Sequence, residues 1–187
     1  MKIGITGARG FLGTAVMAEA KSRHWKVIAY SRSKNAVIDG ADEVRSFADT
    51  ESLDVSGLDA IVHLAGEPIV GLWTKDKLRR VRDSRVDLTT DLVEALARTP
   101  EEERPKVLVS ASGIGFYGNR ADEVLDEKAE VGFGFISELC RAWEAAAYEA
   151  KRHGVRVVVP RIGLVLGDQG LLQKIRPVFK LGIGGRL

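Results

Sequence analysis

The sequence predicts an α/β fold, in which a doubly wound parallel sheet carries helices on both faces. Two observations predict it. Short apolar runs rich in β-branched residues alternate along the chain with longer segments of helical periodicity, which is typical of βαβ units. The first of these runs leads directly into a glycine-rich turn and a helix-like stretch, the order found where a nucleotide binds such a sheet. The chain has 187 residues, a length that suits one domain with a sizeable core.

Each expected strand is a short apolar run bounded by turn residues. In chain order these are the run with Ile3 and Ile5, then Val27–Tyr30, a weaker strand near Val44–Phe47, Asp59–Ala65, Lys106–Ser110 and Val155–Val159. The expected helices are Phe11–Arg23, Lys75–Arg98 and Glu138–His153, the last ending at Gly154. A parallel sheet of this kind binds its ligand outside the carboxyl ends of the strands. We therefore expect the site in the loops that follow the strands.

The turn after the first strand has the spacing Gly7-x-x-Gly10-x-x-Gly13. Gly7 can adopt a tight turn, Gly10 leaves room for a pyrophosphate, and Gly13 lets the helix pack closely on the strand. The helix that begins with Phe11 and Leu12 offers free N–H groups to phosphates. This turn predicts dinucleotide binding, and the alternative is a glycine-rich loop that binds nothing. No Gly-Lys-Ser/Thr follows it, which excludes a Walker phosphate loop.

The end of the second strand indicates which dinucleotide is bound. An NAD site places an Asp or Glu there to accept from the ribose 2′-OH, but this chain has Ser31, Arg32 and Ser33. The planar cation of Arg32 and the hydroxyl of Ser31 suit a 2′-phosphate, and Arg9 in the glycine turn is close enough in sequence to approach it. We therefore expect NADP in preference to NAD. The alternative is that Arg32 is an ordinary surface arginine.

Composition excludes several other classes of protein. No apolar run approaches the roughly 20 residues that cross a bilayer, and no signal peptide is evident, so we expect no membrane partner. The formal net charge of +2 is too small to argue for nucleic acid. The single cysteine, Cys140, cannot form an internal disulfide, and no residue pattern has metal-ligand spacing. We expect a cytoplasmic protein, or an organellar one if a transit peptide has been removed.

Several segments, in their order along the chain, carry a resemblance to a known family. They are Thr6–Gly13, His63–Ile69, Trp73-Thr74, Ser84–Val86, Ser110–Gly118, Glu138–Glu144 and Arg161–Gly167. With these segments the chain resembles an extended short-chain dehydrogenase/reductase, of the atypical branch described as NAD(P)-dependent nucleotide-sugar epimerase-like. The resemblance implies a Rossmann-like domain over residues 1–167 that holds NADP.

The resemblance also implies roles for residues beyond the glycine turn. Leu64, Ala65 and Gly66 would line the cofactor, and Glu67 would face its ribose or pyrophosphate. Ala48 and Asp49 would lie near the adenine. Ser110 and Arg161 are further candidates for cofactor contact.

The catalytic residues of the superfamily are mostly missing from this chain. Its members use a Ser or Thr after the fifth strand and a Tyr-x-x-x-Lys on the next helix, where the Lys lowers the pKa of the Tyr. Ser112 can serve as the serine, which would polarise a carbonyl, with Ser110 as a second candidate. Ile136 and Cys140 fall at the Tyr and Lys positions, so we expect the chain to lack the motif. We name Tyr117 as the replacement proton donor.

Arg85 appears at the position of the superfamily's active-site Asn. Two roles are open for it: contact with a phosphate, or a surface ion pair with Asp83 or Asp87. We expect Cys140 to be a small buried hydrophobe rather than a reactive thiol.

The function expected from these residues is that of an NADP-binding, epimerase- or reductase-like enzyme with a non-standard proton donor. Its substrate would be a small molecule, sugar-nucleotide-like or a simple carbonyl or alcohol. The alternative is a regulator or redox sensor that binds NADP(H) without catalysis. Residues 168–187 are expected to begin a C-terminal substrate lobe that is truncated here. A homodimer through the long helices is left open.

Overall fold

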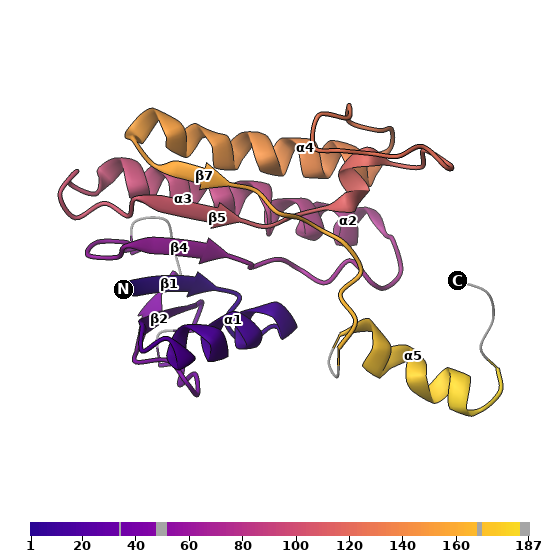
Figure 1. Cartoon of the computed structure of the whole chain (residues 1–187), viewed down its shortest axis with the longest axis horizontal. Helices are drawn as coiled ribbons and strands as arrows, with labels where there is room; N and C mark the ends of the chain where they lie inside the picture. The colour runs from indigo at the N-terminus through magenta and orange to yellow at the C-terminus, as the bar shows by residue number, and fades with distance from the viewer. Residues whose placement is uncertain (34, 48–51, 168–169, 184–187) are drawn as a thin grey trace.

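The structure is a computed structural model that describes residues 1–33, 35–47, 52–167 and 170–183. Its centre is a six-stranded, wholly parallel sheet in the order β3-β2-β1-β4-β5-β7 (Figure 1). The strands are β1 Lys2–Thr6, β2 Lys26–Ser31, β3 Glu43–Ser46, β4 Ala60–His63, β5 Val107–Ser110 and β7 Arg156–Val158. This order confirms the predicted doubly wound α/β class, including the weak strand expected near Val44.

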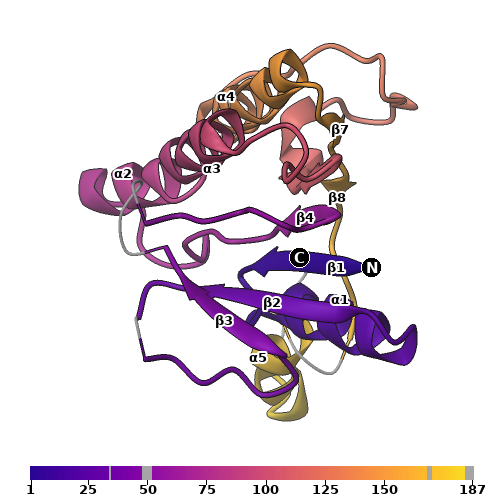
Figure 2. The same ribbon diagram turned by 90° about the vertical axis from the view of Figure 1, so that its left-hand side faces the viewer.

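Helices cover both faces of the sheet, as Figure 2 shows. One face carries α1 (Phe11–Ser22), and the other carries α2 (Lys75–Asp83), α3 (Val86–Arg98) and α4 (Phe135–Tyr148). A short 3₁₀ helix, η1 (Ile114–Tyr117), precedes α4, and another, η2 (Glu149–His153), follows it. The helices lie on both faces because the crossovers are right-handed and the strand order runs outward from β1 in two opposite directions.

Two apolar clusters correspond to the two faces. The cluster beneath α1 contains Ile5 and Val27 of the sheet and Met17 of the helix. The cluster on the other face contains Ile61 and Leu108 of the sheet with Leu92 and Leu96 of α3. Side chains from neighbouring positions of one strand enter opposite clusters because side chains alternate along a strand. The central strands β2 and β4 are therefore apolar on both faces, as expected of a buried parallel sheet.

The predicted single helix over Lys75–Arg98 is wrong, because the structure has two helices separated at Ser84 and Arg85. Both side chains compete for helical carbonyls. Ser84 Oγ donates to Val81 O, and Arg85 Nη1 donates to the same oxygen. The backbone of Arg85, with φ −112° and ψ −60°, departs from ideal helix geometry. Side-chain bonds of this kind weaken the helical ladder, a cost that apolar periodicity does not reveal.

The alanine-rich helix differs from its prediction in where it begins and in the type of its last turn. It begins at Phe135, directly after Gly134 with φ 95°, and its last turn is the 3₁₀ helix η2 rather than α-helix. Its predicted end is correct: Gly154 is left-handed, with φ 75°, a conformation that glycine adopts without a Cβ penalty.

A two-stranded pair lies at the carboxyl end of the sheet, where β6 (Ser112–Gly113), which follows β5, pairs with β8 (Arg161–Ile162), which follows β7. The helix α5 (Leu171–Lys180) then lies away from the sheet in Figure 1. In the part of the chain described, no helix is both long and apolar enough to cross a membrane.

Candidate functional site

The site lies at the point where the strand order reverses, between β1 and β4. Gly7 follows β1 with φ 70°, and Leu64 follows β4. A Cβ at Gly7 would lie 2.8 Å from Leu64 O and 2.9 Å from Ala65 N, closer than real Cβ contacts come. Only glycine lets the two loops approach in this way, which places them side by side at the topological switch point of the sheet.

The remaining glycines of the turn have separate structural reasons. A Cβ at Gly13 would collide with the carbonyl oxygen of Gly7 and with Ala8 Cα, so Gly13 sets how closely α1 packs on β1. A Cβ at Gly10 would lie 3.1 Å from Gly7 O. Gly10 is the N-cap of α1, no side chain caps this end, and the first turn has no acidic residue. The first N–H groups of the helix are therefore available to an anion.

Two cavities flank this turn, and Gly7 lines both of them. The first has a volume of about 550 Å³ and opens over the ends of β1 and β2. Of the residues predicted to bind cofactor, it is lined by Gly7, Arg9, Ser31, Arg32, Ala65 and Gly66. Tyr30, Ser33, Ile38, Phe47, Ser84 and Leu88 complete it; of these, Ser33 was noted in the sequence only as part of the segment that ends the second strand, and the other five were not predicted. Ala48 and Asp49, expected near an adenine, lie outside the described residues.

The first cavity has a basic, hydroxyl-rich rim. The backbone N–H of Ser33 donates to Ser31 Oγ, which shapes the turn after β2. Arg9 Nη2 lies 3.4 Å from Val37 O, which holds the Arg9 side chain over the loop that follows β2. Arg32 is exposed at the same rim. Two arginines therefore lie at the rim of the first cavity.

The second cavity, of about 560 Å³, lies over the ends of β4 and β5 and is mostly apolar. Predicted residues in its lining are Gly7, Gly10, Phe11, Leu12, Gly13, Leu64 and Ser112. Ile136 and Cys140 of α4 also line it. The Tyr and Lys positions of the superfamily therefore face this cavity, with apolar or weakly polar side chains in their place.

A buried polar network holds the loop after β4. Thr6 Oγ1 accepts from the backbone N–H groups of Leu64 and Ala65, at 3.1 and 3.2 Å. His63 is fully buried, with Nδ1 2.7 Å from Thr6 Oγ1 and Nε2 3.0 Å from Thr89 Oγ1. Burial lowers the pKa of His63 to about 4. The histidine is part of the strand wall, and through Thr6 it helps to hold the loop after β4 in place.

Arg85 is buried and lines the second cavity rather than pairing with an acid on the surface. Its Nη1 donates to Glu67 O at 2.9 Å, and its guanidinium carbon lies 5.3 Å from the ring centroid of Trp143. The surface ion pair proposed for it does not form: Asp83 and Asp87 pair with Arg82 instead. Arg85 also packs against Gly66, where an added Cβ would come within 3.1 Å of it.

Glu67 is held by cations. Its Oε1 lies 2.9 Å from Lys77 Nζ and 3.8 Å from Arg80 Nε. The hydrogen bond from Lys77 is the main reason that the pKa of Glu67 lies below its usual range, and Arg32 also contributes. A carboxylate stabilised in this way is a poor proton acceptor near neutral pH, which argues against Glu67 as a base. Its contact with cofactor stays a prediction.

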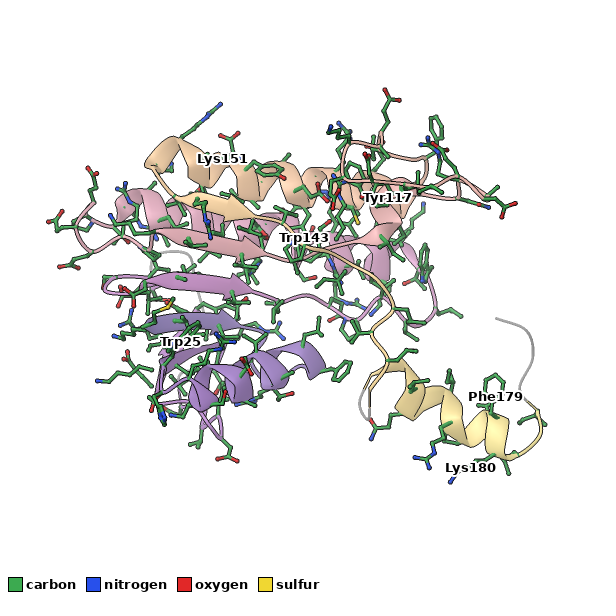
Figure 3. The ribbon with its side chains drawn as sticks, in the orientation of Figure 1. Trp25, Tyr117, Trp143, Lys151, Phe179 and Lys180 are labelled. Carbon is green, nitrogen blue, oxygen red and sulfur yellow. The ribbon has the colours of Figure 1, made fainter. Side chains whose placement is uncertain are left out.

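The two predicted catalytic side chains belong to one hydrogen-bonded chain. Ser112 Oγ donates to Glu144 Oε1 at 2.6 Å. Arg161 donates to both oxygens of Glu144, from Nε to Oε1 and from Nη2 to Oε2, each at 2.9 Å. Its Nη1 donates to Tyr117 OH at 3.0 Å. Figure 3 shows Tyr117 above the carboxyl ends of the strands. Tyr117 and Arg161 are not among the residues that line either cavity, so their predicted contacts with substrate and cofactor stay predictions.

A comparison with known proteins identifies the family. A model of the NAD dependent epimerase/dehydratase family matches residues 3–177 of the chain. The chain belongs to this family.

Two relatives sharpen the placement within the NAD dependent epimerase/dehydratase family. The epimerase family protein SDR39U1 homolog of Arabidopsis thaliana, described as chloroplastic, is 35% identical over 194 residues, which cover 100% of this chain and 56% of that protein. The crystal structure of the human epimerase family protein SDR39U1 (isoform 2) with NADPH matches with a TM-score of 0.85 and 30% identity, covering 99% of this chain and 61% of that one.

A third relative is a nucleoside-diphosphate sugar epimerase from Corynebacterium glutamicum, with a TM-score of 0.78 and 32% identity, covering 100% of this chain and 38% of that one. The chain thus spans less than two thirds of the length of these relatives. The resemblance to an atypical extended short-chain dehydrogenase/reductase is confirmed, and the chain is an NAD(P)-binding member of the epimerase family.

Within this family member, one expectation about sequence needs correction. Tyr-x-x-x-Lys is absent from α4, where the superfamily carries it, but Tyr30 and Lys34 do have this spacing. Tyr30 is part of the packing of β2: its ring is buried and its OH donates to Asp54 O at 2.6 Å. Burial is the main cause that raises its pKa above the usual value. Lys34 lies outside the described residues.

Sequence reasoning missed Glu144 as a site residue. It was seen only as the end of the matching segment Glu138–Glu144. A glutamate in an apolar helix can signal a buried ion pair, because Glu is almost never buried unless it is paired. The partner of Glu144 is Arg161, which the sequence had suggested only as a candidate for cofactor contact.

Ser110 Oγ is buried and has no hydrogen-bond partner in the part of the chain described. The described residues hold no metal-binding cluster.

Proposed function

We propose that this protein is an NADP-dependent oxidoreductase or epimerase of the SDR39U1 type. The observation that carries the proposal is the pair of cavities that meet at Gly7, with Arg9 and Arg32 around the first and Ser112 in the second. A dinucleotide has two ends of unlike chemistry, and this pair of cavities offers each a suitable lining.

The residues present fit such a cofactor. The glycines after β1 leave no Cβ between the main chain and a pyrophosphate, and the uncapped end of α1 supplies N–H groups. The adenosine end would occupy the first cavity, with Arg32 and Arg9 at the 2′-phosphate. The nicotinamide end would occupy the second, beside Ser112. When bound, the nicotinamide supplies a reversible hydride acceptor and donor.

The preference for NADP rests on the end of β2. A 2′-phosphate carries about two negative charges and accepts hydrogen bonds, so a guanidinium attracts it where a carboxylate would repel it. Ser31, Arg32 and Ser33 put no carboxylate at this point. The human relative solved with NADPH points the same way.

The substrate we propose is a small molecule that reaches the second cavity, either sugar-nucleotide-like or a simple carbonyl or alcohol. The mostly apolar lining around Leu64 and Ile136 suits the carbon skeleton of such a molecule. We further propose that the protein works in the cytoplasm, or in an organelle as the name of the Arabidopsis relative suggests for that protein, without nucleic acid or membrane partners. Homodimer formation is compatible with this proposal.

A second function is favoured by one specific observation. Ile136 and Cys140 face the second cavity where the superfamily carries its Tyr and Lys. A protein without that proton relay could bind NADP(H) and report its level without turning over a substrate.

The first experiment is a calorimetric titration of the chain with NADPH and with NADH, repeated on Arg32→Ala. We expect NADPH to bind more tightly, and the variant to lose about ten-fold in NADPH affinity, close to 1.4 kcal/mol, with NADH affinity unchanged. Arg152→Ala removes a charge from an exposed ion pair on η2 and is the matched control. If NADPH and NADH bind equally to both proteins, the NADP assignment fails, and if neither nucleotide binds, the proposed function fails.

A further inference from the structure

The proton of Ser112 has a fixed direction in this structure. Arg161 donates to both oxygens of Glu144, which is the charge-assisted fork of a guanidinium on a carboxylate. An ionised carboxylate only accepts hydrogen bonds. The 2.6 Å contact between Ser112 Oγ and Glu144 Oε1 must therefore be donated by the serine. Ser112 has one proton, and that proton points at Glu144.

The same hydroxyl lines the second cavity. With its proton committed to Glu144, Ser112 can offer only lone pairs to a molecule bound there. Cys140 Sγ also contacts Ser112, but a sulfur atom is only a weak hydrogen-bond acceptor, so the charge-assisted bond to Glu144 keeps the serine proton. This direction is opposite to the carbonyl-polarising role expected of the serine in the sequence.

Glu144 is buried, with 5% of its surface exposed, and its partner Ser112 has 4% exposed. A carboxylate is rarely buried without a reason, because taking it out of water costs several kcal/mol unless it is paired. Arg161 supplies the pairing charge, and it is held in place by Tyr117 and by stacking 3.5 Å from the Phe116 ring centroid. The Glu144 carboxylate is therefore held in a fixed orientation, ready to accept the hydrogen bond from Ser112.

We propose that Ser112, oriented by Glu144, recognises a hydroxyl group of the ligand by accepting its hydrogen bond. A molecule that presents an O–H group at this point of the second cavity is therefore preferred over one that presents a carbonyl oxygen. Ser112 touches the substrate, and Glu144 is a positioning residue that acts through it. This assignment rests on the proposed function.

The test uses two probes of the same shape, cyclohexanol and cyclohexanone, titrated without nucleotide by saturation-transfer NMR. The alcohol has an O–H to donate and the ketone has none. We expect the alcohol to bind about five-fold more tightly, the size of one hydrogen bond. Equal affinity, a preference for the ketone, or no binding of either probe would overturn the proposal.

The variant Glu144→Gln tests the role of Glu144. Its amide can donate to Ser112 Oγ and release the serine proton toward the cavity. The preference should then disappear or reverse in favour of cyclohexanone. A retained preference for the alcohol contradicts the proposal, because a merely structural role for Glu144 would change the affinity for both probes alike.

Two further variants keep the test decisive if Glu144→Gln folds poorly. Ser112→Ala should lower the affinity for cyclohexanol to that of cyclohexanone. Ser137→Ala is the matched control, since Ser137 is a buried serine of α4 whose hydroxyl donates to Gly115 O, and it should leave the preference unchanged. NADPH titration of the same proteins separates the two proposals. If the unsubstituted protein binds NADPH but shows no preference for the alcohol, only the role given to Ser112 and Glu144 is refuted. If the unsubstituted protein does not bind NADPH, the proposed function is refuted.

Discussion

His63 Nε2 lies 3.0 Å from Thr89 Oγ1, and this contact ties the end of β4 to α3. The direction of each bond around it can be worked out. Thr6 Oγ1 accepts from two backbone N–H groups, so its proton goes to His63 Nδ1. Nε2 must then carry the ring proton and donate to Thr89, whose own proton goes to Arg85 O. The network works only with a neutral imidazole.

This network predicts how stability depends on pH. In the folded protein the pKa of His63 is about 4, against an ordinary value of 6.5. Between these values the unfolded chain binds a proton that the folded protein rejects, so stability falls as pH drops from about 6.5 toward 4. For a fully buried group this is worth about 3 kcal/mol at the lower end. Chemical denaturation at pH 7, 5.5 and 4.5 measures it.

The control for this prediction is a comparison of two histidine variants. His63→Gln should lower stability at pH 7 and flatten the loss between pH 6.5 and 4.5. His24→Gln, at an exposed position after α1, should leave the slope as it is. A slope that His63→Gln does not change would show that other groups cause the acid sensitivity.

The glycine turn predicts two different outcomes for two alanine variants. At Gly13 a Cβ would meet the backbone at Gly7 and Ala8, so Gly13→Ala should push α1 off β1 and cost about 2 kcal/mol. At Gly10 the backbone conformation is ordinary and the nearest atom is 3.1 Å from the added Cβ, so Gly10→Ala should cost less than about 1 kcal/mol. Thermal unfolding measures both.

NADPH titration completes the comparison of the two glycines. Because Gly10 faces the expected pyrophosphate, Gly10→Ala should weaken NADPH binding by at least about ten-fold while the fold persists. Unchanged binding in Gly10→Ala would mean that the phosphate does not approach the turn.

Arg85 is predicted to stabilise both the fold and the cofactor loop. Arg85→Ala removes the hydrogen bonds to Glu67 O and Val81 O and the stacking on Trp143, and should cost about 2 kcal/mol. Arg85→Lys keeps the charge without the planar fork and should be intermediate. Differential scanning calorimetry measures the change in stability, and NADPH titration measures the effect on cofactor binding. Arg82→Ala, which removes only exposed ion pairs, should have almost no effect, and an effect as large as that of Arg85→Ala would contradict this account.

Cys140 is predicted to be unreactive in the folded protein. Burial is the main cause that raises the pKa of its thiol above the ordinary value, and the thiolate is the reactive form. Reaction with Ellman's reagent at pH 8 should be about 100-fold slower than in the unfolded chain, because it must wait for local opening. Fast modification in the native state would return Cys140 to the list of reactive groups.

Much of the cofactor end of the site was predictable because it is local in sequence. The strand, the turn with Gly7, Gly10 and Gly13 and the helix start lie within one short segment, and steric demands on each residue select its type. Arg32 could be placed because it comes directly after β2, a strand that its apolar residues identify in the sequence. The parallel order of the sheet then brings these strand ends to one edge without further information.

The surroundings of Ser112 were predictable only in part. Ser112 was named from the sequence and its role stays a prediction, but the direction of its hydrogen bond depends on Glu144, which is 32 residues away in the chain. Arg161 was assigned to the cofactor, whereas in the structure it pairs with Glu144, 17 residues from it, and with Tyr117, 44 residues from it. No pattern of neighbouring residues encodes such pairings.

The sequence by itself determined the α/β class and the glycine turn, because each of these depends on backbone sterics or apolar periodicity over a few residues. The tertiary structure alone decided that Arg85 is buried, that α2 and α3 are separate, and that Ser112 points its proton at Glu144. These outcomes depend on which distant polar groups burial forces together, since a buried charge or hydroxyl must find its partner wherever the fold places one.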